Sequence, residues 1–262
     1  GINVFDINTG EMIADLTFPA NVNLDVQDVV VSTDGGTLHA VAILQGIAPK
    51  DAVFAQASIA ADGTHTWAST TTNVCDYEFV ALAVSALKPG RLLALARSHG
   101  LYDFNPNAIS PVPGVAVPSF NATGVLRVSD DGRWAFAAES MAFPVGSVTP
   151  AFTRIRRIDL NTPTAAPISY NVGGTDLEND VLLERNTLWI TGNPAPGQAK
   201  TLWSFDFNTA AAVNPPTDLN IDTMTRLAAV PSQNALLVIM WAYSARKKSA
   251  NRIAEYSVWY PP

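Results

Sequence analysis

The chain has 262 residues, of which 48% are hydrophobic and 15% are charged, so it has the material for a full core and is not a disordered segment. Its net charge of −7 argues against nucleic acid as a partner. The single cysteine, Cys75, excludes an intrachain disulfide and a cysteine-rich zinc site. No apolar run reaches the roughly 18 residues of a membrane-spanning helix.

Two features of the sequence bear on where the protein is located and how it is processed: a glycosylation sequon and the first residues of the chain. The acceptor sequence Asn121-Ala122-Thr123 lies in a predicted loop and favours an extracellular or cell-surface protein, with the cytoplasm left open. The chain begins at Gly1 without Met or a signal-peptide pattern, so we expect a processed product or a fragment.

A short motif recurs along the chain: an apolar residue, Asp, an apolar residue and Asn, followed by Thr or Pro. Its copies, two of them degenerate, lie at residues 5–9, 57–59, 102–106, 158–162, 205–209 and 256–258. The central positions 6, 58, 103, 159, 206 and 257 are separated by 52, 45, 56, 47 and 51 residues. Alternating residues repeated at this interval are typical of the blades of a β-propeller.

A second repeat interleaves with the first and consists of an apolar run, a polar turn and another apolar run. Its clearest turn is Ser129-Asp130-Asp131-Gly132, and this pattern predicts a β-hairpin. The first run of each copy is nearly continuous in apolar residues, as expected for the innermost strand of a buried sheet. The copies span residues 29–42, 81–96, 126–138, 181–191 and 227–240.

Together the repeats predict strands in the order a, b, c and d, where a and b form the hairpin and c carries the Asp motif. No segment shows helical periodicity, and 18 prolines and 16 glycines interrupt the chain often. We therefore predict an all-β fold: one β-propeller domain of four-stranded blades over residues 1–262. An immunoglobulin-type sandwich is the structural alternative, but it does not explain the repeat.

The repeats are compatible with either five or six blades. Six copies of strand c accompany only five hairpins, and the chain both begins and ends on a strand c. A five-bladed ring closed by the N- and C-terminal strands in one blade is favoured, because a complete ring leaves no open edge. Six blades are expected if the N-terminus is incomplete.

The first unit of the chain carries a resemblance to a known superfamily. Residues 4–10, Val-Phe-Asp-Ile-Asn-Thr-Gly, are followed by residues 31–35, Val-Ser-Thr-Asp-Gly. This pair of turns resembles the repeat of the YVTN or lactonase-like β-propellers. The resemblance implies the propeller fold, and it leaves the activity open because that superfamily hosts enzymes, binding modules and scaffolds.

The loops between strands predict where a ligand would bind. The a–b and c–d turns are short and lie on one face, whereas the b–c and d–a connections lie on the other. The long connections include residues 112–123, 143–151, 192–200 and 243–251. Long loops on a rigid scaffold are the usual carriers of binding, so we expect the ligand face there.

Polar side chains are predicted to converge where strands a begin on that face. The candidate ligand-binding residues are Asp25, Asp28, Glu78, Asn179 and Asp180. Such oxygen ligands suit Ca²⁺, the one cofactor we consider, or could supply the acid/base pair of a glycosidase. The alternative is that Asp28 and Asp180 accept hydrogen bonds from loop amides and bind nothing. His99, on a b–c loop, is the further candidate for a catalytic general base.

Two other sets of residues have structural interpretations. Asp6, Asp103, Asp159 and Asp206 each precede a turn, and we expect them to accept hydrogen bonds from turn amides. The six tryptophans do not align between repeats, so packing between blades is favoured over sugar-binding sites.

The sequence thus favours a binding or interaction module over an enzyme. The expected partner is a protein, or a small-molecule or carbohydrate ligand, and not nucleic acid. The alternatives are a lactonase-like or glycosidase-like hydrolase with an acidic, calcium-binding channel mouth, and a fragment or subunit of a larger assembly.

Overall fold

The computed structural model describes a set of segments that together carry all of its strands. They are residues 2–5, 9, 11–16, 24–32, 34–44, 52–60, 64–67, 72–75, 79–84, 91–96, 100–105, 108–111, 122–141, 152–162, 165–173, 180–194, 198–219, 224–230, 235–242 and 253–259. All the secondary-structure elements in these segments are β-strands, in agreement with the predicted all-β class. None of these residues forms a helix long and apolar enough to cross a membrane.

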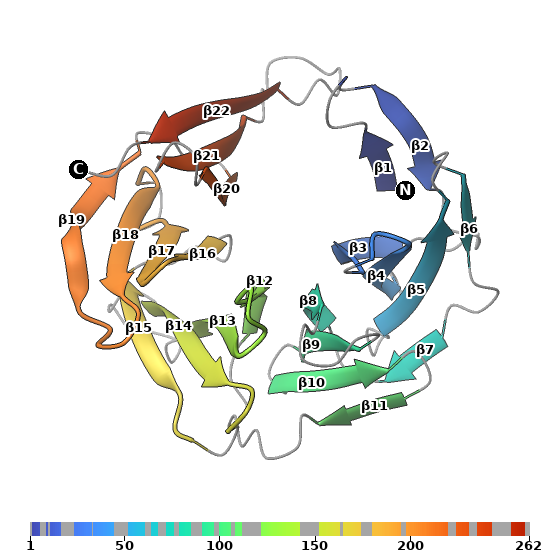
Figure 1. Ribbon diagram of the computed structural model, residues 1–262, viewed down its shortest axis with the longest axis horizontal. Coiled ribbons are helices and arrows are strands. Elements are labelled where there is room, and N and C mark those ends of the chain that lie inside the picture. Colours follow the sequence, from blue (N-terminus) through green and yellow to red (C-terminus); the bar gives the residue numbers. More distant parts are fainter. Residues whose placement is uncertain are drawn as a thin grey trace, which may run out of the picture. The chain divides into compact units, whose positions relative to one another are not determined.

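The strands form antiparallel sheets whose members follow one another in the chain (Figure 1). A hairpin of β1 (Ile2–Phe5) and β2 (Met12–Leu16) comes first. Blade 1 contains β3 (Leu24–Val31), β4 (Thr37–Leu44), β5 (Ala52–Ile59), β6 (His65–Trp67) and β7 (Thr72–Cys75), the last two both pairing with β5. Blade 2 contains β8 (Phe79–Val84), β9 (Leu92–Ala96), β10 (Gly100–Asn105) and β11 (Ala108–Pro111).

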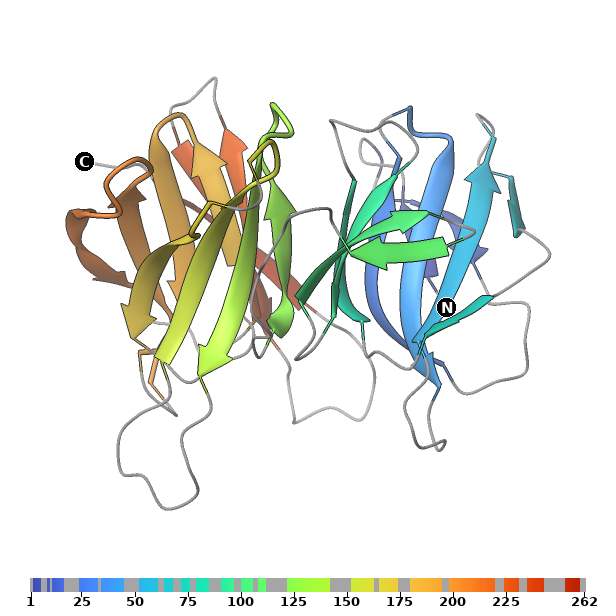
Figure 2. The ribbon, with the colours of Figure 1, turned by 90° about the horizontal axis from the view of Figure 1, so that it is seen from below.

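The remaining blades continue the same order. Blade 3 contains β12 (Ala122–Val128), β13 (Trp134–Met141), β14 (Phe152–Asp159) and β15 (Ile168–Gly173). Blade 4 contains β16 (Asp180–Glu184), β17 (Thr187–Gly192), β18 (Thr201–Asp206) and β19 (Ala212–Asp218). Blade 5 contains β20 (Met224–Val230), β21 (Ala235–Ala242) and β22 (Ile253–Trp259). In Figure 2 the strands of blades 3 and 4, coloured green to orange, are seen running alternately up and down.

The a-b-c-d order predicted from the two repeats is therefore confirmed in blades 2, 3 and 4, and in blade 1 strand d is divided into two pieces. The chain separates into two compact units, residues 1–119 with 130–132 and residues 120–129 with 133–262. The number of blades, their closure by the two terminal strands and a single domain over residues 1–262 stay predictions.

Within each unit, neighbouring blades bury apolar faces against each other. In the first unit Val41 and Phe54 of blade 1 share a core cluster with Phe79, Leu82 and Leu92 of blade 2. In the second unit one cluster joins blades 3 and 4, and its largest side chains are Phe136, Tyr170, Phe205 and Phe207. Face-to-face burial of alternating apolar residues is what holds such sheets together.

The predicted a–b hairpins are confirmed by their turns. In blade 1 the Oδ1 atom of Asp34 accepts hydrogen bonds from Ser32 Oγ (2.5 Å) and from the N–H of Gly36 (2.9 Å), and Gly35 takes a φ of 74°. In blade 3 Gly132 takes a φ of 72°, which an L side chain disfavours. The Ser-x-Asp-Gly turn thus uses glycine where the backbone is left-handed.

The Asp motif marks the end of strand c, as predicted. Asp206 Oδ1 accepts hydrogen bonds from the N–H groups of Asn208 (3.0 Å) and Thr209 (2.8 Å), and Asp159 Oδ1 accepts one from Asn161 (2.9 Å). Hydrogen bonds to the N–H and hydroxyl of Thr209 lower the pKa of Asp206. The structural interpretation is thus supported for Asp159 and Asp206.

Asp103 differs, because its Oδ1 atom accepts a hydrogen bond from Arg91 Nε at 2.5 Å. This contact nevertheless belongs to a repeated pattern. In blades 3 and 4 the strand c carboxylate also pairs with the residue just before strand b: Asp159 with Arg133, and Asp206 with Asn186. Asp6 lies outside the described residues.

The outermost strand of blade 4, β19, contains Pro215 and Pro216. Both fit there because proline is tolerated in a sheet chiefly on an edge strand. Its side chains are exposed or half-exposed throughout.

Candidate functional site

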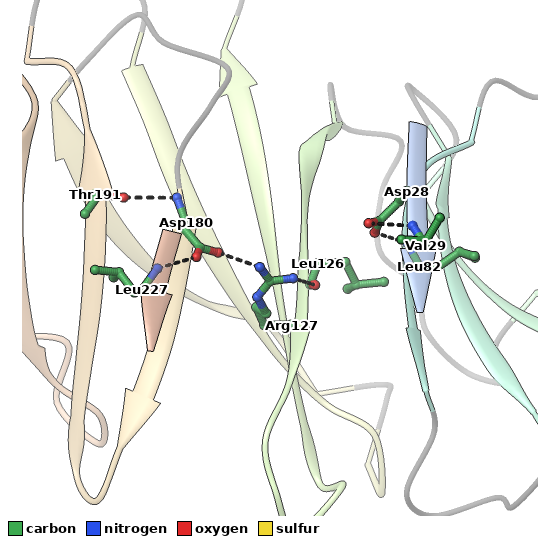
Figure 3. A network of polar contacts seen from close by, with 8 residues as sticks. All are labelled: Asp28, Val29, Leu82, Leu126, Arg127, Asp180, Thr191 and Leu227. Atoms are coloured by element: carbon green, nitrogen blue, oxygen red, sulfur yellow. Dashed lines mark hydrogen bonds and ion pairs between the residues drawn. The ribbon is translucent and has the colours of Figure 1, made fainter. Parts of the chain in front are cut away.

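Asp28, the first of the two predicted catalytic carboxylates, lies in the innermost strand of blade 1 beside a β-bulge between Val26 and Asp28. Its Oδ2 atom accepts a hydrogen bond from the N–H of Leu82 at 2.8 Å, and its Oδ1 atom accepts one from Val29 at 2.9 Å (Figure 3). Leu82 belongs to β8, the innermost strand of blade 2. Asp28 therefore joins two neighbouring inner strands.

Asp180, the second of these carboxylates, begins the innermost strand of blade 4 and is fully buried. Its Oδ2 atom accepts a hydrogen bond from the N–H of Leu227, in β20 of blade 5, at 2.8 Å. Its own N–H donates to Thr191 Oγ1 at 3.2 Å (Figure 3). The same bond between inner strands thus occurs in both units, from a carboxylate of strand a to a backbone amide of the next blade.

Asp180 also has a cationic neighbour that the sequence analysis missed. Nη2 of Arg127, in β12 of blade 3, lies 2.9 Å from Asp180 Oδ1 (Figure 3). This oxygen is buried and receives no hydrogen bond of normal angle from the described residues, so the contact compensates its charge rather than completing its hydrogen bonding. Asp180 consequently links blades 3, 4 and 5.

Both aspartates accept hydrogen bonds from backbone amides, as the structural alternative expects, and their binding of a ligand stays a prediction. The amides that they bind belong to strands and not to loops. We name Asp28 with Leu82, and Asp180 with Leu227 and Arg127, the inter-blade clamps.

The other predicted site residues lie wholly or partly outside the described residues. Asp25 lies in β3 opposite Ile43, with its side chain outside the described part. Glu78, Asn179 and His99 lie outside the described residues. Among the residues that are described, no three His, Cys, Asp or Glu side chains gather closely enough to hold a metal ion, and the calcium alternative stays a prediction.

A second polar cluster, also missed by the sequence analysis, lies in blade 3. Glu139 of β13 accepts hydrogen bonds from Arg156 Nε at 2.8 Å and from Arg156 Nη2 at 3.2 Å, and from Arg154 Nε. Glu139 and Arg156 are buried, whereas the side chain of Arg154 is 28% exposed. We name these three residues the Glu139 network.

The electrostatics of the Glu139 network are set by opposing effects. Burial alone would raise the pKa of Glu139, but the hydrogen bonds and charges of Arg154 and Arg156 outweigh it and hold the pKa below its usual value. Glu139 is therefore ionised at neutral pH. The network contains two guanidinium groups for one carboxylate.

The strand register explains why these side chains meet. Glu139 stands directly opposite Arg154 on the neighbouring strand, and Arg156 is opposite Ala137, two residues away on the same face. Both Glu139 and Arg154 lie two residues from the strand ends, Met141 and Phe152, that border the long connection of residues 142–151. The network thus lies at the end of the blade where we predicted the ligand face.

A third cluster joins blades 3 and 4 at the opposite ends of these strands. The guanidinium of Arg157 lies over the rings of Trp134 (4.6 Å) and Phe207 (4.3 Å), and Arg133 lies over Trp134 at 4.6 Å. The hydroxyl of Tyr170 donates to the Phe207 carbonyl at 2.7 Å, and Arg157 Nη1 donates to the same oxygen. This arrangement supports the prediction that tryptophans pack between blades, since Trp134 contacts Phe207 edge-on.

No protein-family model matches the chain, and no curated protein matches its sequence. Solved structures do match. The Kuenenia stuttgartiensis hydrazine synthase has a TM-score of 0.54 at 14% identity over 93% of this chain, and the Dos1 propeller has 0.54 at 10% identity over 97%. The Trypanosoma rangeli sialidase has 0.55 at 11% identity over 98% of this chain.

These likenesses bear on the fold alone because the identities are low. The chain spans 65% of the length of the hydrazine synthase chain, 64% of the Dos1 propeller and 49% of the sialidase, which is less than two thirds of each. The four-stranded antiparallel blades and the match to a named propeller agree with each other. The fold of this chain is that of a β-propeller.

Proposed function

We propose that this chain is a β-propeller binding module whose ligand face is formed by the long b–c and d–a connections. The observation that carries the proposal is the structural use of Asp28 and Asp180, whose carboxylates bind backbone amides of the next blade. These are the two carboxylates that the alternative interpretation as a hydrolase would use. Their use as clamps favours a scaffold that presents loops.

The chemistry of acid/base catalysis supports this choice. A general acid or base must come within hydrogen-bonding distance of the group that it protonates or deprotonates. Asp180 is fully buried, one of its oxygens accepts the Leu227 amide and the other faces Arg127. An aspartate held in this way stabilises the blade junction and offers little to a substrate.

The partner in this proposal is a protein, or a small-molecule or carbohydrate ligand, met outside the cell or at its surface. A rigid sheet with variable loops at one end is the usual arrangement for such recognition. The Dos1 propeller and the sialidase share the fold, and their likeness to this chain supports neither a module nor an enzyme over the other.

The test compares the wild type with Asp28→Asn and Asp180→Asn, using fluorogenic glycosides and aliphatic lactones with and without added Ca²⁺. We expect the wild type to show no hydrolysis that depends on Asp28 or on Asp180. We also expect each substitution to lower the unfolding midpoint, because breaking the pairing of a hydrogen-bonded carboxylate costs about 1–3 kcal/mol, with the larger cost at the fully buried Asp180. Chemical denaturation measures this loss.

The opposite result would be plain. If the wild type turns over a glycoside or a lactone, and Asp28→Asn or Asp180→Asn abolishes turnover while the unfolding midpoint is unchanged, the chain is a hydrolase. Dependence of that turnover on Ca²⁺ would restore the calcium alternative as well.

A further inference from the structure

We propose that the Glu139 network is a binding site for a carboxylate group of a small organic ligand, with Arg154 as the residue that binds it. This inference rests on the proposed function, since it assigns a ligand class to one edge of the ligand face. It starts from an imbalance within the network itself.

Arg154 is the cation in excess. Arg156 already engages both oxygens of Glu139, through Nε to Oε2 at 2.8 Å and through Nη2 to Oε1 at 3.2 Å. Arg154 shares Oε2 through its Nε atom alone. Among the described residues no other acceptor for Arg154 is found, which leaves its two terminal nitrogens as the candidate donors to a ligand.

Exposure and neighbours make those nitrogens accessible. The side chain of Arg154 is 28% exposed, whereas Glu139 beside it is 7% exposed. On the next strand Asn171 stands directly opposite Arg154, and Asn171 is exposed. Residues opposite each other in a ladder point to the same side of the sheet, so an amide flanks the guanidinium.

The geometry of the guanidinium selects the ligand. With Nε donating to Glu139, and with no acceptor for the Nη atoms in the part of the chain that the structure describes, the Nη end of the guanidinium can donate two parallel hydrogen bonds to a ligand. A planar carboxylate accepts such a pair in a bidentate manner. The bond from Glu139 also fixes the orientation of Arg154 before any ligand arrives, which lowers the entropic cost of binding.

Comparison between the blades shows that the network is not part of the repeated scaffold. Glu139 and Arg154 face each other between strands b and c of blade 3. The residues at the same register positions are Ala42 and Val53 in blade 1, and Gly192 and Thr201 in blade 4. Small or apolar residues therefore suffice for packing there. Sites that break a repeated local rule are commonly functional.

The experiment follows the Nε–H signal of Arg154 by nuclear magnetic resonance while acetate, succinate, inorganic phosphate or chloride is added at constant ionic strength. We expect saturable shifts with acetate and succinate that chloride does not produce. Arg154→Met should weaken carboxylate binding about tenfold or more, the value of one charge-assisted hydrogen bond. The matched control is Arg133→Met, which removes the same charge at the other end of the same blade.

A second variant guards against loss of folding in Arg154→Met. Glu139→Gln keeps a side-chain oxygen that can accept the hydrogen bond from Arg154 Nε and orient the guanidinium, but it removes the negative charge, so acetate and succinate should bind more tightly than to the wild type. The assignment is overturned if carboxylates give no saturable shift, if Arg154→Met binds them as the wild type does, or if phosphate binds more tightly than succinate.

The result is separable from the test of the proposed function. Loss of this site with no hydrolysis dependent on Asp28 or Asp180 would refute the carboxylate assignment and leave the binding module standing. Hydrolysis removed by either Asp→Asn substitution would refute the module whatever the outcome at Arg154.

Discussion

Two residues other than glycine take a left-handed backbone conformation in the described chain, Arg185 with a φ of 55° and Ala210 with a φ of 57°. Arg185 lies in the a–b turn of blade 4, and Ala210 ends the turn that follows Asp206, where its N–H donates to the Asp206 carbonyl at 2.9 Å. In the first copy of the same motif the corresponding residue is Gly10. An alanine at this position carries a steric cost that glycine avoids.

We therefore expect Ala210→Gly to raise the free energy of unfolding by about 1 kcal/mol, because glycine adopts this φ without a Cβ clash. Urea denaturation measures the change. Ala211→Gly is the control: its φ is not left-handed, so the added chain entropy should destabilise the protein slightly. Equal effects of the two substitutions would contradict the explanation.

The second residue-scale prediction concerns pH. The hydrogen bond from Arg133 holds the pKa of Asp159 at about 2, below its ordinary value of 3.8. A carboxyl whose pKa is lowered in the folded state stabilises the protein at every pH above the carboxyl's ordinary pKa. That stabilisation is lost as the pH falls through the pKa of the folded state. The pair should thus contribute at neutral pH, weaken below about 4 and vanish near 2.

Asp159→Asn tests this, since asparagine does not titrate. The wild type should be the more stable protein at pH 7, and the difference in unfolding midpoint should shrink steadily as the pH falls from about 4 towards 2. Arg133→Met should show the same convergence. A gap that stays constant down to pH 2 would disprove the role of the ion pair.

At the scale of strands, the inter-blade clamps connect the inner strands of neighbouring blades. Each is built from an aspartate of one strand a, which accepts a hydrogen bond from a backbone amide of the next strand a. The Asp180 clamp also includes a guanidinium from the preceding blade, that of Arg127. This clamp should therefore be stronger than it would be without Arg127.

A double-mutant cycle on Asp180 and Arg127 measures that difference. We expect Asp180→Ala to cost about 2–4 kcal/mol, because a buried amide and a guanidinium lose their partner, and Arg127→Met to cost less because that side chain is 42% exposed. The coupling energy should be positive and of about 1 kcal/mol. Strict additivity of the two substitutions would deny the three-blade link.

For the molecule as a whole, much of the fold could be predicted from the sequence because its repeats record local chemistry. The Asp of strand c and the Asp-Gly turn of the hairpin are needed wherever the chain reverses, so Asp159, Asp206, Gly35 and Gly132 were found in the roles expected. The alternation of apolar residues likewise located the strands. These signals act over a few residues and are readable in any one copy.

The candidate site was less readable because it depends on contacts between distant positions. Asp28 and Asp180 were recognised by their register, but their partners, Leu82 and Leu227, offer only backbone amides, which leave no mark in a sequence. Glu139, Arg154 and Arg156 could have been noticed as charges of opposite sign in two consecutive predicted strands. Alternation of side chains would then have placed all three on one face.

The pair of prolines in β19 has a consequence for the behaviour of many copies together. Pro215 and Pro216 have no amide hydrogen, so this outer margin of blade 4 cannot offer the regular row of donors on which a foreign strand would grow. Polymerisation of copies of the protein by pairing of their β19 edge strands is therefore disfavoured. The protein can expose a long extended strand at its periphery and still resist fibril formation there.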